Sequence, residues 1–99
     1  MSRNVILRRE RRFVGGGIDW DVYVDGIRFA ALANGKELII PISESSHQIY
    51  YTVDEPTGSG GTQRIHSDVI NIPNGLSSYR FRLYFKMGLF HGIFLFEEE

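Results

Sequence analysis

The sequence predicts an all-β protein, and more closely an antiparallel β-sandwich of seven or eight short strands. Apolar and polar residues alternate with a period of two through most of the chain, which is the pattern of half-buried strands. Turn-forming residues separate the alternating segments at intervals of about 8 to 12 residues. No segment keeps a helical period with caps for more than a turn or two, so helices are not expected.

The first half of the chain contains the clearest hairpin signal. Trp20 faces the apolar side and Asp21 the polar side of an alternating segment that ends at Asp25-Gly26. This dipeptide fits a two-residue type I′ turn, because both central positions of that turn need positive φ. Strands are expected at residues 4–10, 19–24 and 27–31.

The middle of the chain contains a proline and a glycine-rich loop. Leu38-Ile39-Ile40 is continuously apolar, which predicts a strand covered on both faces, and Pro41 predicts that this strand lies at a sheet edge or bends. Residues 54–62 form the longest loop signal, and Gly58 to Gly61 are expected to be its mobile part. Strands are expected at residues 36–42, 47–53 and 63–72.

The C-terminal part shows the clearest alternation, over residues 78–86. Tyr79, Phe81, Leu83 and Phe85 are expected to point inward, and the residues between them outward. A last strand is expected at residues 90–96.

Length and composition predict one folded domain over residues 1–99. Hydrophobic residues make up 42% of the chain, which is too many for a disordered segment. The absence of cysteine excludes disulfides, thiolate metal sites and a cysteine nucleophile. No apolar run approaches the roughly 20 residues of a membrane-spanning helix. We expect a cytoplasmic protein, the alternative being a fragment of a larger anchored or exported protein.

The net charge of −1 conceals an uneven distribution of charge. Arg3, Arg8 and Arg9 belong to an arginine-rich beginning, whereas the chain closes with Glu97 to Glu99. These runs are interpreted either as solvated ends that keep the protein soluble or as an arginine-lined edge that binds an anion. If the terminal strands are neighbours, the two sets of charge offset one another.

No catalytic, cofactor-binding or metal-binding motif is recognised, and no cofactor is expected. His66 and Asp68 are two residues apart on an expected strand, but further metal ligands would have to come from unrelated segments. His47 follows Ser45-Ser46 without the glycines of a nucleophile elbow, so catalysis by this pair is not expected. Asp25 is assigned to its turn.

The outward row formed by Arg80, Arg82 and Tyr84 is the most prominent expected surface feature. Cations alternating with an aromatic ring on one strand face can hold a phosphate and stack a base. The same residues also satisfy strand propensity and discourage aggregation, and this second interpretation is preferred.

A stretch of about a third of the chain resembles small bacterial β-sandwich domains that are mostly uncharacterised. The resemblance rests on the hairpin Val22-Tyr23-Val24-Asp25-Gly26, the turn Asn34-Gly35 and the strand His47-Gln48-Ile49. It departs from their pattern at Ser45-Ser46, where a Pro-Gly is usual, and at Ala30-Ala31. The architecture is similar to prealbumin-like and carboxypeptidase-regulatory-like sandwiches, which implies an accessory or binding module.

The sequence therefore predicts a non-enzymatic module that acts through contact with a protein partner or with a second copy of itself. The residues expected to carry this contact are Arg80, Arg82 and Tyr84. The alternative is a carbohydrate- or polyanion-binding module, nucleic acid included, which uses Trp20, Tyr50, Tyr84 and neighbouring arginines.

Overall fold

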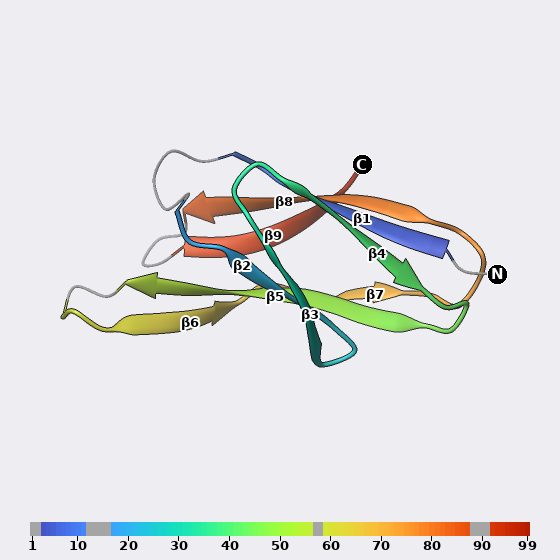
Figure 1. The fold of residues 1–99 in the computed structure, drawn as a ribbon, viewed down its shortest axis with the longest axis horizontal. Coiled ribbons are helices and arrows are strands. Elements are labelled where there is room, and N and C mark those ends of the chain that lie inside the picture. The colour runs from blue at the N-terminus through green and yellow to red at the C-terminus, as the bar shows by residue number, and fades with distance from the viewer. Residues whose placement is uncertain (1–2, 12–16, 57–58, 88–91) are drawn as a thin grey trace.

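The computed structural model describes residues 3–11, 17–56, 59–87 and 92–99, and these form an all-β protein. Two sheets pack against each other, as the two layers of ribbon in Figure 1 show. The described residues include no helix long and apolar enough to span a membrane.

Within the described residues, nine strands make up the two sheets. The four-stranded sheet has the order β4-β1-β8-β9 and comprises β4 (Glu37–Ile42), β1 (Arg3–Arg9), β8 (Tyr79–Met87) and β9 (Gly92–Glu98). The five-stranded sheet has the order β3-β2-β5-β6, with β7 paired to β5 beside β6. Its strands are β3 (Ile27–Leu32), β2 (Trp20–Val24), β5 (His47–Pro56), β6 (Thr62–His66) and β7 (Ile70–Ile72).

The prediction of seven or eight strands is wrong, because one expected strand is divided into two. The single strand expected at residues 63–72 is two strands, β6 and β7, separated at Ser67. The backbone N–H of Ser67 donates to the carbonyl of Tyr51, and the Ser67 hydroxyl accepts the N–H of Tyr51 at 2.9 Å. A side-chain oxygen thus takes the place of a backbone carbonyl, and the ladder is interrupted at this point.

The prediction that every strand pair is antiparallel is also wrong. β1 and β8 are parallel, with Val5 opposite Tyr79 and Leu7 opposite Phe81. All other pairs are antiparallel. Parallel neighbours come from segments far apart in the chain, and alternation within each segment does not reveal that pairing.

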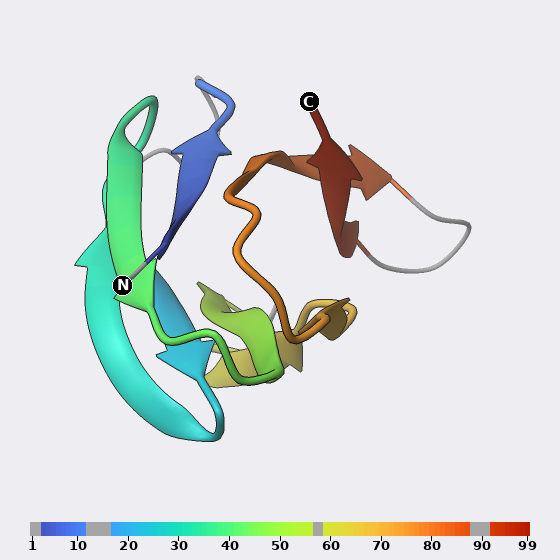
Figure 2. The same ribbon diagram turned by 90° about the vertical axis from the view of Figure 1, so that its right-hand side faces the viewer.

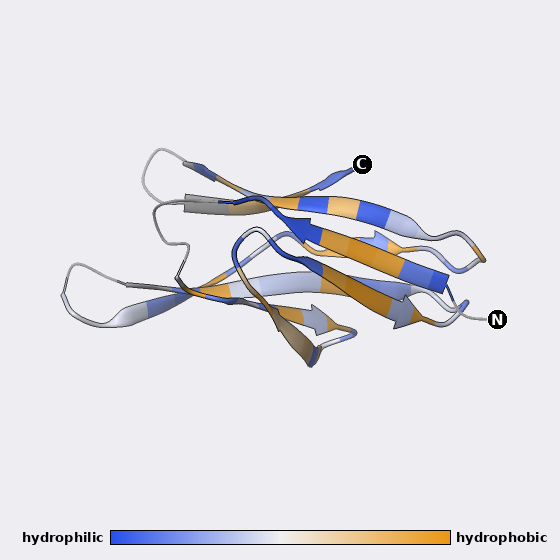
Figure 3. Ribbon diagram, turned by 45° about the horizontal axis from the view of Figure 1, so that its top comes forward, coloured by the Kyte–Doolittle hydropathy of each residue, from blue (hydrophilic) through white to orange (hydrophobic). Residues whose placement is uncertain are grey.

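The core lies between the sheets and follows the predicted alternation. Trp20 and Val22 are fully buried, and Phe81 and Leu83 point inward from β8, whose alternating hydropathy is visible in Figure 3. Trp20 stacks on Tyr51, with ring centroids 4.9 Å apart. Both rings belong to the five-stranded sheet, and Phe94 of β9 meets Trp20 edge-on across the core with centroids 5.2 Å apart, so aromatic contact joins the two layers.

The predicted hairpin at Asp25-Gly26 and the predicted turn at Asn34-Gly35 both agree with the structure, although the second turn leads from one sheet to the other. Asp25 and Gly26 have φ values of 53° and 81°, as a type I′ turn between β2 and β3 requires. Gly35 has a φ of 70° in the turn before β4, where the N–H of Lys36 donates to the carbonyl of Ala33. Glycine tolerates this conformation because it has no Cβ.

β4 lies at the edge of its sheet, as Pro41 predicts. The expectation that Leu38-Ile39-Ile40 is covered on both faces is wrong, because Ile39 is 60% exposed on the outer face. The expected long loop is also shorter, since β5 extends to Pro56 and β6 begins at Thr62. Gly58 lies outside the described residues, and Gly60 adopts a φ of 90° in the remaining turn.

Candidate functional site

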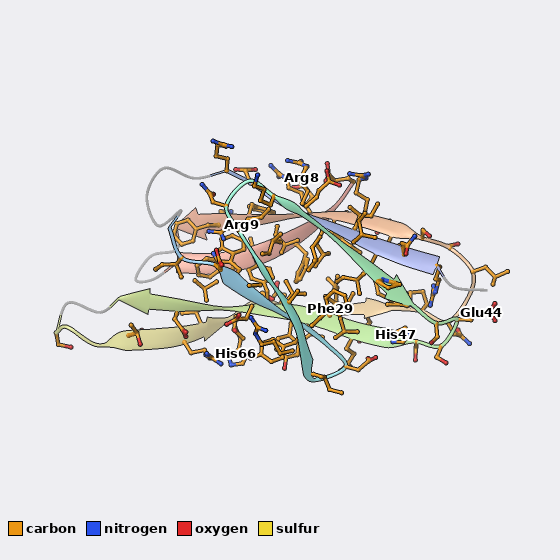
Figure 4. The ribbon with its side chains drawn as sticks, viewed as in Figure 1. Arg8, Arg9, Phe29, Glu44, His47 and His66 are labelled. Carbon is orange, nitrogen blue, oxygen red and sulfur yellow. The ribbon has the colours of Figure 1, made fainter. Side chains whose placement is uncertain are left out.

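Three polar side chains meet at one end of the molecule, where the β2–β3 turn lies beside the loop that follows β4. The Ser43 hydroxyl lies 2.9 Å from His47 Nε2, and His47 Nδ1 lies 2.6 Å from an oxygen of Asp25. We call these residues the Ser-His-Asp cluster. Figure 4 labels His47 at this end of the ribbon, next to Glu44. The order of hydrogen bonds, from serine to imidazole to carboxylate, is that of a catalytic triad.

Backbone pairing between β2 and β5 brings Asp25 to His47. Val24 lies opposite Ile49, so the turn after β2 reaches the first residues of β5. The N–H of Asp25 donates to the carbonyl of Gln48, and the N–H of Gln48 donates back to the Asp25 carboxylate at 2.9 Å. Asp25, which the sequence predicts only as a turn residue, therefore also binds the His47 side chain.

The hydrogen bond from His47 lowers the pKa of the Asp25 carboxyl below its ordinary range, and the N–H of Gln48 lowers it further. Asp25 is therefore ionised at neutral pH. A carboxylate accepts hydrogen bonds only, so His47 Nδ1 carries a hydrogen and donates it. When His47 is neutral, Nε2 is left as the acceptor for the hydroxyl of Ser43.

Arg3 holds the loop that carries Ser43. Its guanidinium donates to the carbonyls of Ser43, Ser45, Pro73 and Ser77 at distances of 2.7 to 3.2 Å. Arg3 is only 3% exposed, so the interpretation of the N-terminal arginines as solvated ends is wrong for this residue. Two loops that are distant in sequence are thus fixed by one buried cation.

A hollow of about 460 Å³ lies beside the cluster. Asp25 and His47 contribute to its wall, and Gln48 donates to the side-chain oxygen of Asn71 at 3.2 Å across strands β5 and β7. The remaining lining residues are Ser46, Ile72 and Pro73. The lining contains neither lysine nor arginine, so the hollow favours neutral or polar groups over anions.

The predicted outward row on β8 is present, but its arginines already have carboxylate partners. Arg82 contacts Glu10 at 2.5 Å and Glu97 at 2.7 Å, and Arg80 contacts Glu37 at 3.3 Å. The Arg82 guanidinium also lies over the ring of Tyr84, 4.6 Å from its centroid. A polyanion would have to displace these carboxylates before it could use the row.

The first and last strands are not neighbours, because β8 lies between β1 and β9, but one pair of terminal charges still meets across the sheet. Arg8 lies on the outer face of β1, labelled in Figure 4, and contacts Glu99 at 3.0 Å. The hydrogen bond from Arg8 lowers the pKa of the Glu99 carboxyl. The charge of Arg8 is therefore compensated by a carboxylate of the C-terminal run.

Trp20 is not available to a ligand at the surface, because it is 0% exposed. The Arg9 guanidinium covers its ring at 4.1 Å from the centroid and donates to the carbonyl of Leu32 at 2.7 Å. Arg9 itself is buried between the layers, where Figure 4 labels it. Both residues belong to the core, and Trp20 is removed from the candidate ligand-binding residues.

Tyr50 lies on the outer face of the five-stranded sheet as part of a row of rings. It stacks on Tyr23 with centroids 5.0 Å apart and planes 5° apart, and His66 lies 5.9 Å away on its other side. Because stacked rings cover each other's faces, this row presents ring edges rather than a flat platform for a sugar. The arrangement is that of cross-strand pairs that stabilise a sheet.

His66 and Asp68 do not share a strand face. β6 ends at His66, and Asp68 follows the interruption at Ser67. Among the residues that the structure describes, no group of three or more His, Asp or Glu side chains is placed to hold a metal ion.

Comparison with protein-family models, with curated proteins and with solved structures found no match to this chain. The sequence-based interpretation missed Ser43 and paired His47 with the wrong serines. The available signal was the position of Asp25-Gly26 and of His47 at strand ends, but only the β2–β5 register places those ends together.

Proposed function

We propose that the protein is a β-sandwich accessory module that acts through protein contact, and that its partner is a second copy of the chain bound along β3. A single observation supports this proposal. β3 ends the order of the five-stranded sheet and exposes two large apolar side chains, with Ile27 74% and Phe29 42% exposed. β3 lies at the outer margin of the molecule, drawn in turquoise in Figure 2.

The other sheet edges carry features that discourage pairing with a further strand. β4 contains Pro41, and β9 ends in Glu97 and Glu98. On the remaining edge, β6 and β7 are short and separated from one another. Proline, charge and interruption are the usual protections of a sheet edge.

β3 has no proline and no uncompensated charge, and its only such feature is an irregular pairing with β2. Its pairing with β2 shifts at Phe29, which has no partner residue on β2. Its one charge, on Arg28, is paired with Asp21 at 3.2 Å. An edge with a compensated charge and two exposed apolar side chains favours addition of another strand.

A second copy fits this edge because β3 is complementary to itself. Antiparallel pairing centred on Phe29 would place Ile27 opposite Ala31 and Arg28 opposite Ala30. No like charges would face each other, and both copies would use the same surface, as a two-fold dimer requires. A strand of six residues gives a small interface, so we expect weak, concentration-dependent association.

Sedimentation velocity over a wide concentration range tests the proposal. We expect a monomer–dimer equilibrium that the double substitution Ile27→Lys and Phe29→Lys abolishes, because two charges would face the added strand. Ile39→Lys is the matched control, since Ile39 is comparably exposed on a strand that carries a proline. A strict monomer at all concentrations, or equal dissociation by the control, contradicts the proposal.

Binding of a polyanion or a carbohydrate is the weaker proposal. Arg80 and Arg82 are neutralised by glutamates, and Tyr50 offers the edge of its ring. Both features reduce the surface that such a ligand requires.

A further inference from the structure

The Ser-His-Asp cluster has the connectivity that activates a serine. Asp25 accepts from one nitrogen of His47, and the hydroxyl of Ser43 lies 2.9 Å from the other. In this arrangement the carboxylate fixes the tautomer of the imidazole, and the free nitrogen removes the hydroxyl proton. Sheet stabilisation alone does not require a third group on Nε2.

The protein environment favours this role for His47. Its side chain is 13% exposed, so water competes little for its hydrogen bonds. Asp25 is held in place by the N–H of Gln48 as well as by the imidazole. The general base is therefore both oriented and supported by a fixed carboxylate.

Ser43 combines an accessible side chain with a fixed backbone. Its side chain lies at the surface, whereas its carbonyl accepts a hydrogen bond from the buried Arg3 at 3.0 Å. The N–H of Ser45 donates a hydrogen bond to the Ser43 hydroxyl oxygen at 3.3 Å and so holds that oxygen beside His47. A hollow with Asp25 and His47 in its wall lies next to this cluster, and Ser43 is beside it rather than among its lining residues.

We propose that Ser43 is an activated nucleophile that takes an acyl group from an ester of a small, uncharged carboxylic acid. The Ser43 oxygen forms a bond to the ester carbonyl carbon while its proton passes to His47 Nε2. Collapse of the tetrahedral adduct breaks the bond to the alkoxy group, which leaves as the alcohol with the proton from Nε2. Water, deprotonated by His47, then attacks the acyl-serine and releases the acid and free Ser43. The absence of lysine and arginine from the hollow disfavours anionic acyl groups.

Labelling of the full chain with a fluorophosphonate probe tests the proposal, with intact-mass measurement and peptide mapping to locate the adduct. We expect one adduct, on Ser43, and none on chain denatured in urea. p-Nitrophenyl acetate should give an acetylated chain at the same residue. Labelling is independent of association through β3, so its failure does not bear on the proposed dimer.

Substitutions distinguish an activated serine from an exposed one. Ser43→Ala should abolish the adduct, and His47→Gln should slow labelling about 100-fold, the usual contribution of a general base. Asp25→Asn keeps the turn but removes the carboxylate, and should slow labelling as well. Ser77→Ala is the matched control, an exposed serine at the same end of the molecule, and should label like the unmodified chain.

Thermal denaturation verifies that each variant is folded. The proposal is overturned if no adduct forms, if the adduct lies on another serine, or if folded His47→Gln and Asp25→Asn variants both label at the original rate.

Discussion

The four-stranded sheet carries arginines on both of its faces, and the two sets have different kinds of partner. On the inner face, Arg3 donates to four backbone carbonyls from two loops. On the outer face, Arg8 and Arg82 contact glutamate side chains. Carbonyls are neutral and fixed by the fold, whereas exposed carboxylates titrate and are screened by salt. The inner arginine therefore stabilises the structure, and the outer ones mainly neutralise a surface.

This difference bears on where a partner binds. The outer face of the four-stranded sheet is rich in charge. Its arginines Arg8, Arg80 and Arg82 each have a carboxylate oxygen within 3.3 Å. The β3 edge has little charge and two exposed apolar side chains. A surface whose charges are internally satisfied gains little from a charged partner, so contact is expected at the apolar edge.

Among substitutions of the inner-face and outer-face arginines, Arg3→Met should have the largest effect on stability. Methionine retains an apolar stem but leaves the carbonyls of Ser43, Ser45, Pro73 and Ser77 without their donor. We expect the free energy of unfolding to fall by about 3 kcal/mol, measured by urea denaturation. Arg8→Met is the control on the other face of the same strand and should change this free energy far less, because solvent screens its pair with Glu99. Equal losses in the two variants would show that burial of the cation is unimportant.

Arg82→Ala should have a smaller effect that depends on salt. The side chain contacts two carboxylates and the ring of Tyr84, but it lies at the surface, where solvent screening makes such pairs weak. The loss of stability should shrink as sodium chloride is raised, because salt screens exposed charges. Thermal denaturation at low and high salt measures it. A loss that stays constant with salt would instead indicate packing of the side-chain stem on Tyr84.

The sequence predicted the faces of individual strands well. Alternation placed Trp20 and Phe81 in the core, and the Asp25-Gly26 dipeptide predicted its turn, because these features depend on neighbours in the chain. The arginines of β1 were harder to assign. Arg3 and Arg9 have the same parity as Val5 and Leu7, but a cation at an inward position is stable only if distant carbonyls are available to it.

The candidate site depended on pairing that local patterns do not contain. Asp25 and His47 are 22 residues apart, and Arg3 reaches carbonyls up to 74 residues away. The sequence shows that Asp25 and His47 each lie at the end of a strand. It does not show that those strands are neighbours in one register, and a shift of one residue would point His47 to the other face.

Acidification should give the smallest of the three changes in stability and should distinguish Arg8 on the outer face from Arg3 on the inner face. The hydrogen bond from Arg8 lowers the pKa of Glu99 in the folded protein, so the folded state binds this proton less readily than the unfolded chain. The stabilisation is therefore complete above the ordinary pKa of a glutamate and is lost as the pH falls through the lowered value. Thermal midpoints measured from neutral pH into acid should fall less steeply for Arg8→Met, which lacks this pair, than for the unmodified chain. Arg3→Met should keep the original slope, because carbonyl partners do not titrate. If Arg3→Met flattens the acid limb and Arg8→Met does not, the assignment of titratable partners to the outer face is wrong.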